Sequence, residues 1–441
     1  MVVLELYDIR IASAETLVEA LVSAYATNPT LKAEQARQRG TDEEVPQALS
    51  GWRPTVTARG SLGQSWSDTN VAKSSSYTPL SVTISLSQPV FRGFKTINGT
   101  KSAEASVEAG RQRLLAVEQS VIFQALQAYM NVLRDRQIVG FRQQNLNALR
   151  QQLQDVAARF AVGEVTRTDV AQSRARVAGA LAGKSSAMAN LASSVAGYVK
   201  IIGHAPGTLR YPKIARLPRS LDEAQSIAQE VNPSILGAAY IERSAGFDVE
   251  VAKGDLLPEF NLAASATASL DPQQSVDRSH SASIDGVLSV PIYEAGRVYS
   301  RVRQSKQLAS QRRLEVIAEG RRVRESVSNA WNNLEAARES IHASKAQVAA
   351  NELALDGVRK EYQVGSRSTL DVLNAQSELV SARITLVSAE HDRVVTAYLL
   401  LSSVGTLTAR DLNLPAAYYD ADENYLNVRG KWIGAGAETV Q

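Results

Sequence analysis

The chain has 441 residues, enough for two or three domains of ordinary size. Its 48 basic and 45 acidic residues leave a formal net charge of only +3, which implies no strong polyelectrolyte partner. The sequence contains no cysteine, so disulfides and thiolate metal sites are excluded.

The N-terminal sequence, MVVLELYDIRIASAETL, lacks the basic and then apolar layout of a signal peptide. It therefore predicts either a cytoplasmic protein or a processed or engineered start. No run of about 20 apolar residues occurs in the chain, so no transmembrane helix is expected. Aromatic residues make up 6% of the chain, which is low for a large globular core but ordinary for long coiled helices.

Four stretches of alternating residues predict β-strands. In Ser81–Pro89, SVTISLSQP, the branched apolar side chains of Val82, Ile84 and Leu86 alternate with hydroxyl side chains. A period of two places these two kinds of side chain on opposite faces of a strand. Similar alternation predicts a first hairpin over residues 52–91 and a second hairpin over residues 257–293.

Very long helices are predicted after each hairpin, because apolar residues recur there at spacings of three and four and proline is absent. We expect two such pairs, over residues 93–161 with 166–203 and over residues 295–362 with 368–404. Only the turns near Gly163 and Gly365 interrupt them. A helix over 93–161 would be on the order of 100 Å long at about 1.5 Å per residue. No compact soluble domain needs that length.

The order of predicted elements occurs twice, which indicates an internal repeat. LVEALVSAYATNP at Leu17–Pro29 aligns with LDEAQSIAQEVNP at Leu221–Pro233. FAVGEVTRTDV at Phe160–Val170 aligns with YQVGSRSTLDV at Tyr362–Val372. We therefore expect a first repeat over residues 14–213, a second over 214–414, and a C-terminal tail over 415–441 with no counterpart. Because the tail lacks periodicity, it is expected to be an irregular equatorial strap around the helices.

The predicted strands favour a membrane over a sheet covered by helices. Each has about the length that a tilted strand needs to cross a bilayer, and aromatic residues stand near the strand ends as in an interfacial girdle. Four strands cannot close into a barrel, and an open edge in lipid leaves unpaired backbone groups. Several chains must then share one barrel, with eight strands from a dimer or twelve from a trimer.

The two-copy layout, the LxEAxxxAxxxNP openings and the turns AVGEVTRTDV and QVGSRSTLDVLNAQSEL resemble the TolC family of outer-membrane factors over roughly Ala14–Leu414. The resemblance implies an α+β membrane protein, a homotrimer with a twelve-stranded transmembrane barrel and a periplasmic tunnel of coiled helices. It also implies docking to a periplasmic adaptor and to an inner-membrane transporter of the ABC or RND type. The expected function is export across the outer membrane of Gram-negative bacteria, as multidrug efflux, type I protein secretion or both, without a cofactor.

The resemblance further implies that the helix-turn-helix tips form the tunnel entrance and contact the adaptor. These tips are expected at Val162, Gly163, Glu164 and Val165 in the first repeat and at Val364, Gly365 and Ser366 in the second. From the residues themselves, the glycines are expected to end one helix in a left-handed conformation. Thr166-x-x-Asp169 and Ser368-x-x-Asp371 are expected to start the next helix as capping boxes.

By the same resemblance, three copies of Asp371 would form an acidic ring that attracts cations. The family pattern often has a second acidic residue one turn later, where this chain has Asn374, so a weaker ring is expected. Links that hold the entrance shut would join Tyr362 to Asp169 and Arg367 to Thr168 or Asp169.

Other functions fit the sequence less well. The four histidines are far apart and accompany no hydrolase, metalloprotease or P-loop motif, so neither an enzyme nor a metal site is expected. The basic residues at positions 301–324 alternate with glutamates around a helix, which argues against nucleic acid. A soluble coiled-coil scaffold is the structural alternative, but it leaves the alternating strands without a purpose.

Overall fold

The computed structural model describes residues 14–68, 75–273 and 276–437. The N-terminal stretch before residue 14 and parts of the two predicted strand-connecting loops lie outside these ranges. Contacts divide the chain into two units, each built from three segments. The first unit comprises residues 1–35, 113–235 and 320–419, and the second comprises residues 36–112, 236–319 and 420–441.

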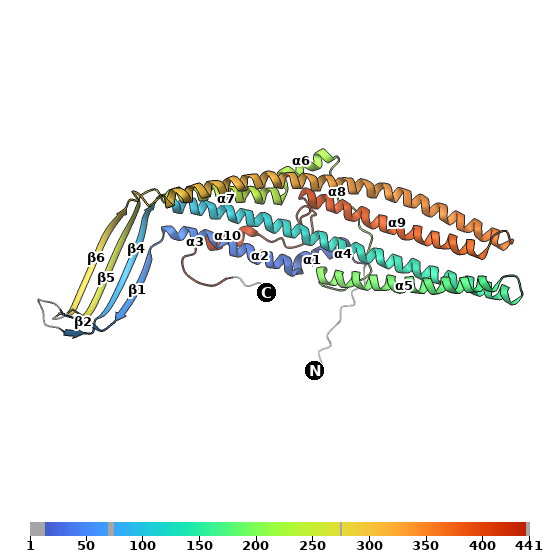
Figure 1. The fold of residues 1–441 in the computed structure, drawn as a ribbon, viewed down its shortest axis with the longest axis horizontal. Helices are drawn as coiled ribbons and strands as arrows, with labels where there is room; N and C mark the ends of the chain where they lie inside the picture. The colour runs from blue at the N-terminus through green and yellow to red at the C-terminus, as the bar shows by residue number, and fades with distance from the viewer. Residues whose placement is uncertain (1–13, 69–74, 274–275, 438–441) are drawn as a thin grey trace, which may run out of the picture. The chain divides into compact units, whose positions relative to one another are not determined.

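The first half of the chain forms short helices, then strands, then two long helices (Figure 1). In chain order these are α1 (Leu17–Thr27), α2 (Pro29–Asp42), α3 (Glu44–Leu49), a 3-10 turn (Ser50–Trp52), β1 (Thr55–Leu62), β2 (Ser65–Ser67), β3 (Ser75–Tyr77), β4 (Leu80–Arg92), α4 (Lys95–Ala161) and α5 (Arg167–Ile202).

The second half follows the same order with fewer short elements. It contains α6 (Leu221–Val231), α7 (Pro233–Gly254), β5 (Glu259–Gln273), β6 (Val276–Ser289), α8 (Arg297–Gln363), α9 (Thr369–Val404) and α10 (Ala421–Arg429). Helices α4 and α8 have 67 residues each, and α5 and α9 have 36 each. Within the described ranges, no helix is both long and apolar enough to cross a membrane.

The second unit contains a four-stranded antiparallel sheet in the order β1-β4-β5-β6. The register aligns aliphatic residues with aliphatic residues, as in the row Val56, Leu86, Ala264 and Ile284. The neighbouring row lies on the opposite face and carries only hydroxyl groups, in Thr57, Ser85, Ser265 and Ser283. The two faces predicted from the alternation are therefore present in the middle of the sheet, whereas nearer the loops the rows of the aliphatic face include His280 and Arg278 on β6.

Hydroxyl groups bond to one another between the strands. The oxygen–oxygen distances are 2.8, 3.0 and 3.1 Å in the pairs Ser61–Ser81, Thr83–Thr267 and Ser265–Ser283. The aliphatic face is exposed in the single chain, with Ile284 77% and Val56 65% exposed. Strands β1 and β6 each have a partner on one side only within the described chain.

The start of the first predicted hairpin, over residues 52–91, differs from the observed structure. Trp52 ends a 3-10 turn rather than beginning a strand, and β1 starts at Thr55. Beyond Leu62, residue Trp66 belongs to β2, which pairs with β3 in a separate two-stranded sheet. Alternation alone does not distinguish one strand from two, because both strands have the same period.

Ion pairs join the sheet of the second unit to its helices. Lys95 Nζ, at the start of α4, donates to Asp255 Oδ1 at 3.0 Å and to Glu259 at the start of β5. Arg301 on α8 also pairs with Asp255, at 2.9 Å. The two carboxylates neutralise two cations at the place where strands become helices.

The first unit holds the larger apolar core. Its main cluster surrounds the fully buried side chains Leu21, Ile122, Leu126, Tyr129 and Tyr198. A second cluster in the same unit packs α6 against α8 and α9 through Ala228, Val327 and Leu400. These contacts hold the short helices against the long ones.

The C-terminal tail is not wholly irregular, which corrects the sequence prediction. Residues 421–429 form α10, whose N-cap Asp420 accepts a hydrogen bond from the backbone of Asp422. The helix is fixed by polar contacts, since Asn424 Nδ2 donates to Asp42 Oδ2 at 2.7 Å and Asp422 pairs with Arg111 at 2.5 Å. These contacts join residues more than 300 positions apart, so no local pattern indicates them.

Candidate functional site: the paired helical turns

Both predicted turns end their first helix in the same way. Gly163 and Gly365 have φ angles of 83° and 80°, in the left-handed region predicted from the sequence. Gly163 N–H bonds to the carbonyl of Phe160 at 3.1 Å, and Glu164 N–H bonds to the carbonyl of Arg159 at 3.0 Å. This pair of bonds is the Schellman motif, which satisfies carbonyl groups left free at the end of a helix.

The second turn repeats this geometry. Gly365 N–H bonds to the carbonyl of Tyr362 at 3.1 Å, and Ser366 N–H bonds to the carbonyl of Glu361 at 3.0 Å. Each tip carries one strongly exposed valine, with Val162 72% and Val364 80% exposed, beside the exposed polar residues Glu164 and Ser366. Val165 is half-buried. The two turns therefore present apolar side chains on rigid backbones.

The predicted capping boxes are confirmed at the start of α5 and α9. Asp169 Oδ2 accepts the backbone N–H and the hydroxyl of Thr166 at 2.9 and 2.7 Å. Asp371 Oδ2 accepts the same two groups of Ser368 at 3.0 and 2.8 Å. In return, each N-cap oxygen accepts the backbone N–H of its aspartate. Helix capping alone thus accounts for an aspartate at each of these two positions.

The capping contacts also set the charge of Asp371. The backbone N–H and then the hydroxyl of Ser368 lower the pKa of its carboxyl below the usual 3.8, because both donate to the ionised form. Only Oδ2 is used, and no described donor contacts Oδ1. The carboxylate is therefore ionised at neutral pH and has one oxygen available for a cation.

The residues expected to hold the entrance shut have other contacts within the chain. Arg367 Nε donates to Glu361 Oε2 at 2.8 Å, and this carboxylate raises the pKa of the guanidinium. The ring centre of Tyr362 lies 4.9 Å from the guanidinium of Arg159, a cation–π distance. The Tyr362 hydroxyl accepts a bond of 3.4 Å from Thr369.

The structure brings the two helix pairs together near the turns. Arg159 lies in the last turn of α4 and Tyr362 in the last turn of α8, so their contact joins the first pair to the second. Arg176 on α5 donates to Asn374 Oδ1 on α9 at 3.0 Å. Thr168 is exposed and Asp169 is half-buried. Asn374, which stands where the family pattern often has an acidic residue, thus has a hydrogen-bond partner in Arg176.

Sequence reasoning did not identify Arg159, Arg176 or Glu361. Glu361 could have been found, because it is six residues before Arg367 across a turn whose geometry was predicted. The two arginines could not, because their contacts depend on how separate helices pack. Of the four histidines, His391 is 9% exposed and contacts Asn131 and Asp392.

Comparison with known proteins identifies the architecture. The family model described as outer membrane efflux protein matches residues 20–204 and again residues 225–406. The outer membrane efflux protein BepC of Brucella suis biovar 1 (strain 1330) is 41% identical over 426 residues, which cover 96% of this chain and 92% of BepC. The outer membrane protein TolC of Escherichia coli (strain K12) is 27% identical over 430 residues, covering 91% of this chain and 84% of TolC.

A solved structure has the same fold. The crystal structure of the CmeC outer membrane channel of Campylobacter jejuni superposes with a TM-score of 0.80 at 14% identity, covering 94% of this chain and 89% of that one. The matched proteins are channels rather than enzymes. The chain therefore belongs to the outer membrane efflux protein family, the family of TolC, and is an export channel of the outer membrane that extends into the periplasm.

Proposed function

We propose that three copies of this chain share one twelve-stranded transmembrane barrel, continued in the periplasm by a tunnel of coiled helices. The observation that carries the proposal is the four-stranded sheet, in which β1 and β6 each leave one edge unpaired within the described residues. An unpaired edge in lipid costs several kcal/mol per backbone group, and closure with other copies removes that cost. The number three rests on the family resemblance.

The two faces of the sheet support this arrangement. The exposed aliphatic row through Val56 and Ile284 suits contact with lipid, and the row of small hydroxyl side chains suits a water-filled lumen. In a sheet buried under helices, the aliphatic face would be covered within the chain. Here it is exposed.

The internal repeat is part of the same proposal. The family model matches the chain twice, and the long helices of the two halves have equal lengths. Each chain would then supply two equivalent helix pairs to the tunnel. Three chains would supply twelve helices around a common axis.

The mass of the purified complex in detergent tests the shared barrel. Analytical ultracentrifugation should find three chains per particle, and removal of detergent should cause aggregation. A monodisperse monomer that is soluble without detergent would instead mean that the sheet is covered by protein, as in the coiled-coil scaffold. Two chains per particle would replace the trimer by an eight-stranded barrel.

The turns are proposed to be the periplasmic entrance that contacts the adaptor and, with it, an inner-membrane transporter of the ABC or RND type. The support is the exposure of Val162 and Val364 on turns that are rigid by their own hydrogen bonds. The cargo would be small toxic molecules in efflux, secreted polypeptides in type I secretion, or both. Val364→Asp should weaken export in cells while leaving single-channel conductance unchanged, and equal loss of both would contradict docking.

Asp371 is proposed to form the acidic ring of the entrance, with Asn374 as a neutral neighbour. The support is its ionised carboxylate with an unoccupied Oδ1. Asp371→Asn should remove cation preference in planar bilayers but retain the helix cap, because an amide oxygen can still accept from Ser368. Asp371→Ala should remove both. Unchanged cation preference in the Asn variant would exclude the ring.

Arg367 is proposed to exchange partners when the entrance closes. In the chain it pairs with Glu361, and in the closed assembly it would pair with Thr168 or Asp169 while Tyr362 contacts Asp169. Arg367→Ala combined with Tyr362→Phe should raise conductance. Glu361→Gln should lower it, because it frees Arg367 for the closing contact. Changes of the same sign in both variants would contradict the exchange.

A further inference from the structure

Two large apolar side chains in the C-terminal tail are exposed. Trp432 is 66% and Ile433 is 92% exposed, and they are adjacent in the sequence KWIG that follows α10. Isolated exposed apolar residues are ordinary. It is unusual for a tryptophan and a neighbouring isoleucine both to be exposed where hydrogen bonds hold the nearby backbone in place, as they do here.

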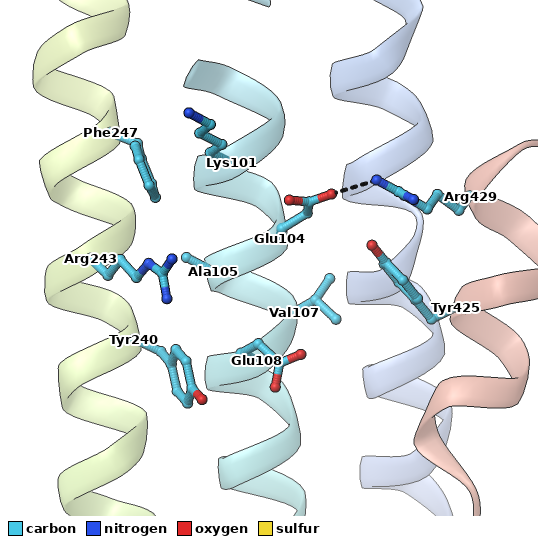
Figure 2. Close-up of a pocket in the computed structure, with 10 residues that line it drawn as sticks. All are labelled: Lys101, Glu104, Ala105, Val107, Glu108, Tyr240, Arg243, Phe247, Tyr425 and Arg429. Carbon is cyan, nitrogen blue, oxygen red and sulfur yellow. Dashed lines mark hydrogen bonds and ion pairs between the residues drawn. The ribbon is translucent and has the colours of Figure 1, made fainter. Parts of the chain in front are cut away.

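The preceding helix is fixed against α4 within the second unit. Figure 2 shows Tyr425 and Arg429 reaching from α10 toward α4, where Arg429 Nη2 donates to Glu104 Oε1 at 2.9 Å. Tyr425 packs against the small cluster that contains Val45 and Val107. The segment that carries Trp432 therefore leaves from a docked helix.

The segment after α10 is also fixed at the beginning of the sheet. Arg53 Nη1 donates to the carbonyl of Lys431 at 2.7 Å, and the Arg53 guanidinium lies 4.8 Å from the ring centre of Trp432. Arg53 precedes Thr55, the first residue of β1, by two positions. Lys431 and Trp432 are thus held beside the end of the sheet at which the chain changes from helix to strand, and Ile433 directly follows them.

The position of Trp432 and Ile433 at the end of the sheet, and the residue types around them, indicate what covers these two side chains. Helices follow the sheet at this end, so it is the periplasmic end of the proposed barrel. Tryptophan prefers the interface between headgroups and acyl chains, where its ring is in an apolar environment and its N–H in a polar one. The Arg53 guanidinium lies over the Trp432 ring, and Lys431, whose ammonium donates to the carbonyl of Gly436 at 2.8 Å, precedes it in the chain. Cations at the membrane interface interact with lipid phosphates.

We infer that residues 431–434 form an interfacial anchor, in which Trp432 and Ile433 insert into the periplasmic leaflet of the outer membrane. The inference rests on the proposed passage of the sheet through the bilayer. The occupant is a phospholipid surface rather than a second protein, because Trp432 is held against Arg53, two residues before β1 and so at the rim of the proposed membrane-spanning sheet, where an interfacial tryptophan is expected.

Tryptophan fluorescence tests the anchor, because the chain contains only four tryptophans, at positions 52, 66, 331 and 432. A variant that retains Trp432 and has phenylalanine at the other three positions is reconstituted into lipid nanodiscs. The nanodiscs contain either ordinary phosphatidylcholine or phosphatidylcholine brominated near the top of its acyl chains. Bromine quenches only indoles that reach the acyl region, so a Trp432 ring at the interface should lose fluorescence in the brominated lipid relative to the ordinary lipid.

Two matched variants serve as controls for the depth of Trp432 in the bilayer. A variant that retains only Trp331, half-buried on α8 in the first unit, should show no quenching by bromine. A variant without the four native tryptophans but with Ile284→Trp reports on the aliphatic face of the sheet. Quenching of that reporter without quenching of Trp432 would overturn the anchor and leave the barrel intact. Absence of quenching in both would overturn the proposed membrane passage itself.

Acrylamide, a water-soluble quencher, separates the two ways in which the anchor could be wrong. Quenching of Trp432 by acrylamide but not by bromine would place the tail in water. Protection from both quenchers would place it against protein, such as a second copy of the chain. Either outcome overturns the inference, and quenching by bromine with protection from acrylamide supports it.

Discussion

The sheet and the paired turns satisfy their backbone hydrogen bonds in opposite ways. Each turn is complete within about ten residues, because a Schellman motif ends one helix and a capping box starts the next. The sheet is incomplete within the described chain, because β1 and β6 each lack a partner on one side. Substitutions in the turns should therefore affect local stability, whereas substitutions in the sheet should affect assembly.

The largest expected effect comes from a charge on the lipid-facing side of the sheet. Ile284→Lys places an ammonium group near the middle of the bilayer, which costs about 2–4 kcal/mol per site, and each assembled particle contains several such sites. We expect loss of the oligomer in detergent-solubilised membranes, measured by ultracentrifugation. Ser283→Lys, the adjacent position on the hydroxyl face, should leave most of the oligomer intact. Equal loss of the oligomer in both variants would contradict the proposal that one face of the sheet contacts lipid and the other contacts water.

A smaller effect is expected in the turn between α8 and α9. Gly365→Ala forces a side chain into the left-handed region, at a cost of about 1–2 kcal/mol. Gly357→Ala is the matched control, because an added Cβ meets nothing within 4 Å at either position and only Gly365 has a positive φ. Hydrogen exchange of the turn should accelerate in the first variant only. Acceleration in both would mean that the turn depends on tertiary packing.

The smallest effect concerns the cap of α9 and its pH dependence. Ser368→Ala removes the N-cap hydroxyl, which typically contributes about 1 kcal/mol. Separately, the pKa of Asp371 is lowered in the folded protein, first by the backbone N–H and then by the hydroxyl of Ser368, so the stability that its ionised carboxylate adds is present above pH 3.8 and is lost as the pH falls through the lowered value. In the variant, the pKa should rise toward 3.8, and cation preference in planar bilayers should disappear at a higher pH than in the wild type.

Thr166→Ala removes the equivalent cap of α5 and serves as its control. It should destabilise the first turn similarly without moving the pH at which cation preference disappears. A shift of that pH in both variants would mean that the two turns are electrostatically coupled.

Local patterns in the sequence predicted the elements well. Alternation predicted four strands with an aliphatic and a hydroxyl face, because the pleat has a period of two. Gly365 and Ser368 predicted a helix end and a helix start, because both depend on backbone groups within a few residues. The pattern did not reveal that Trp66 lies in a separate small sheet.

Contacts between distant segments could not be predicted. Helix α10 depends on Asp42 and Arg111, and neither lies near it in the sequence. The contact of Arg159 with Tyr362 likewise needs two long helices at a particular rotation. The roles of Asp371 and Arg367 in an entrance remain predictions, because a single chain does not contain the neighbours they would face.

The unpaired edges of β1 and β6 have a consequence for how the protein reaches its membrane. If the edges close only against other copies, the sheet cannot form fully in an isolated chain, and folding becomes a step of association. Its rate would then depend on the concentration of chains, as subunit assembly does, rather than on the search of one chain for its own contacts. Newly made chains would need protection of their strands until enough copies meet at the bilayer.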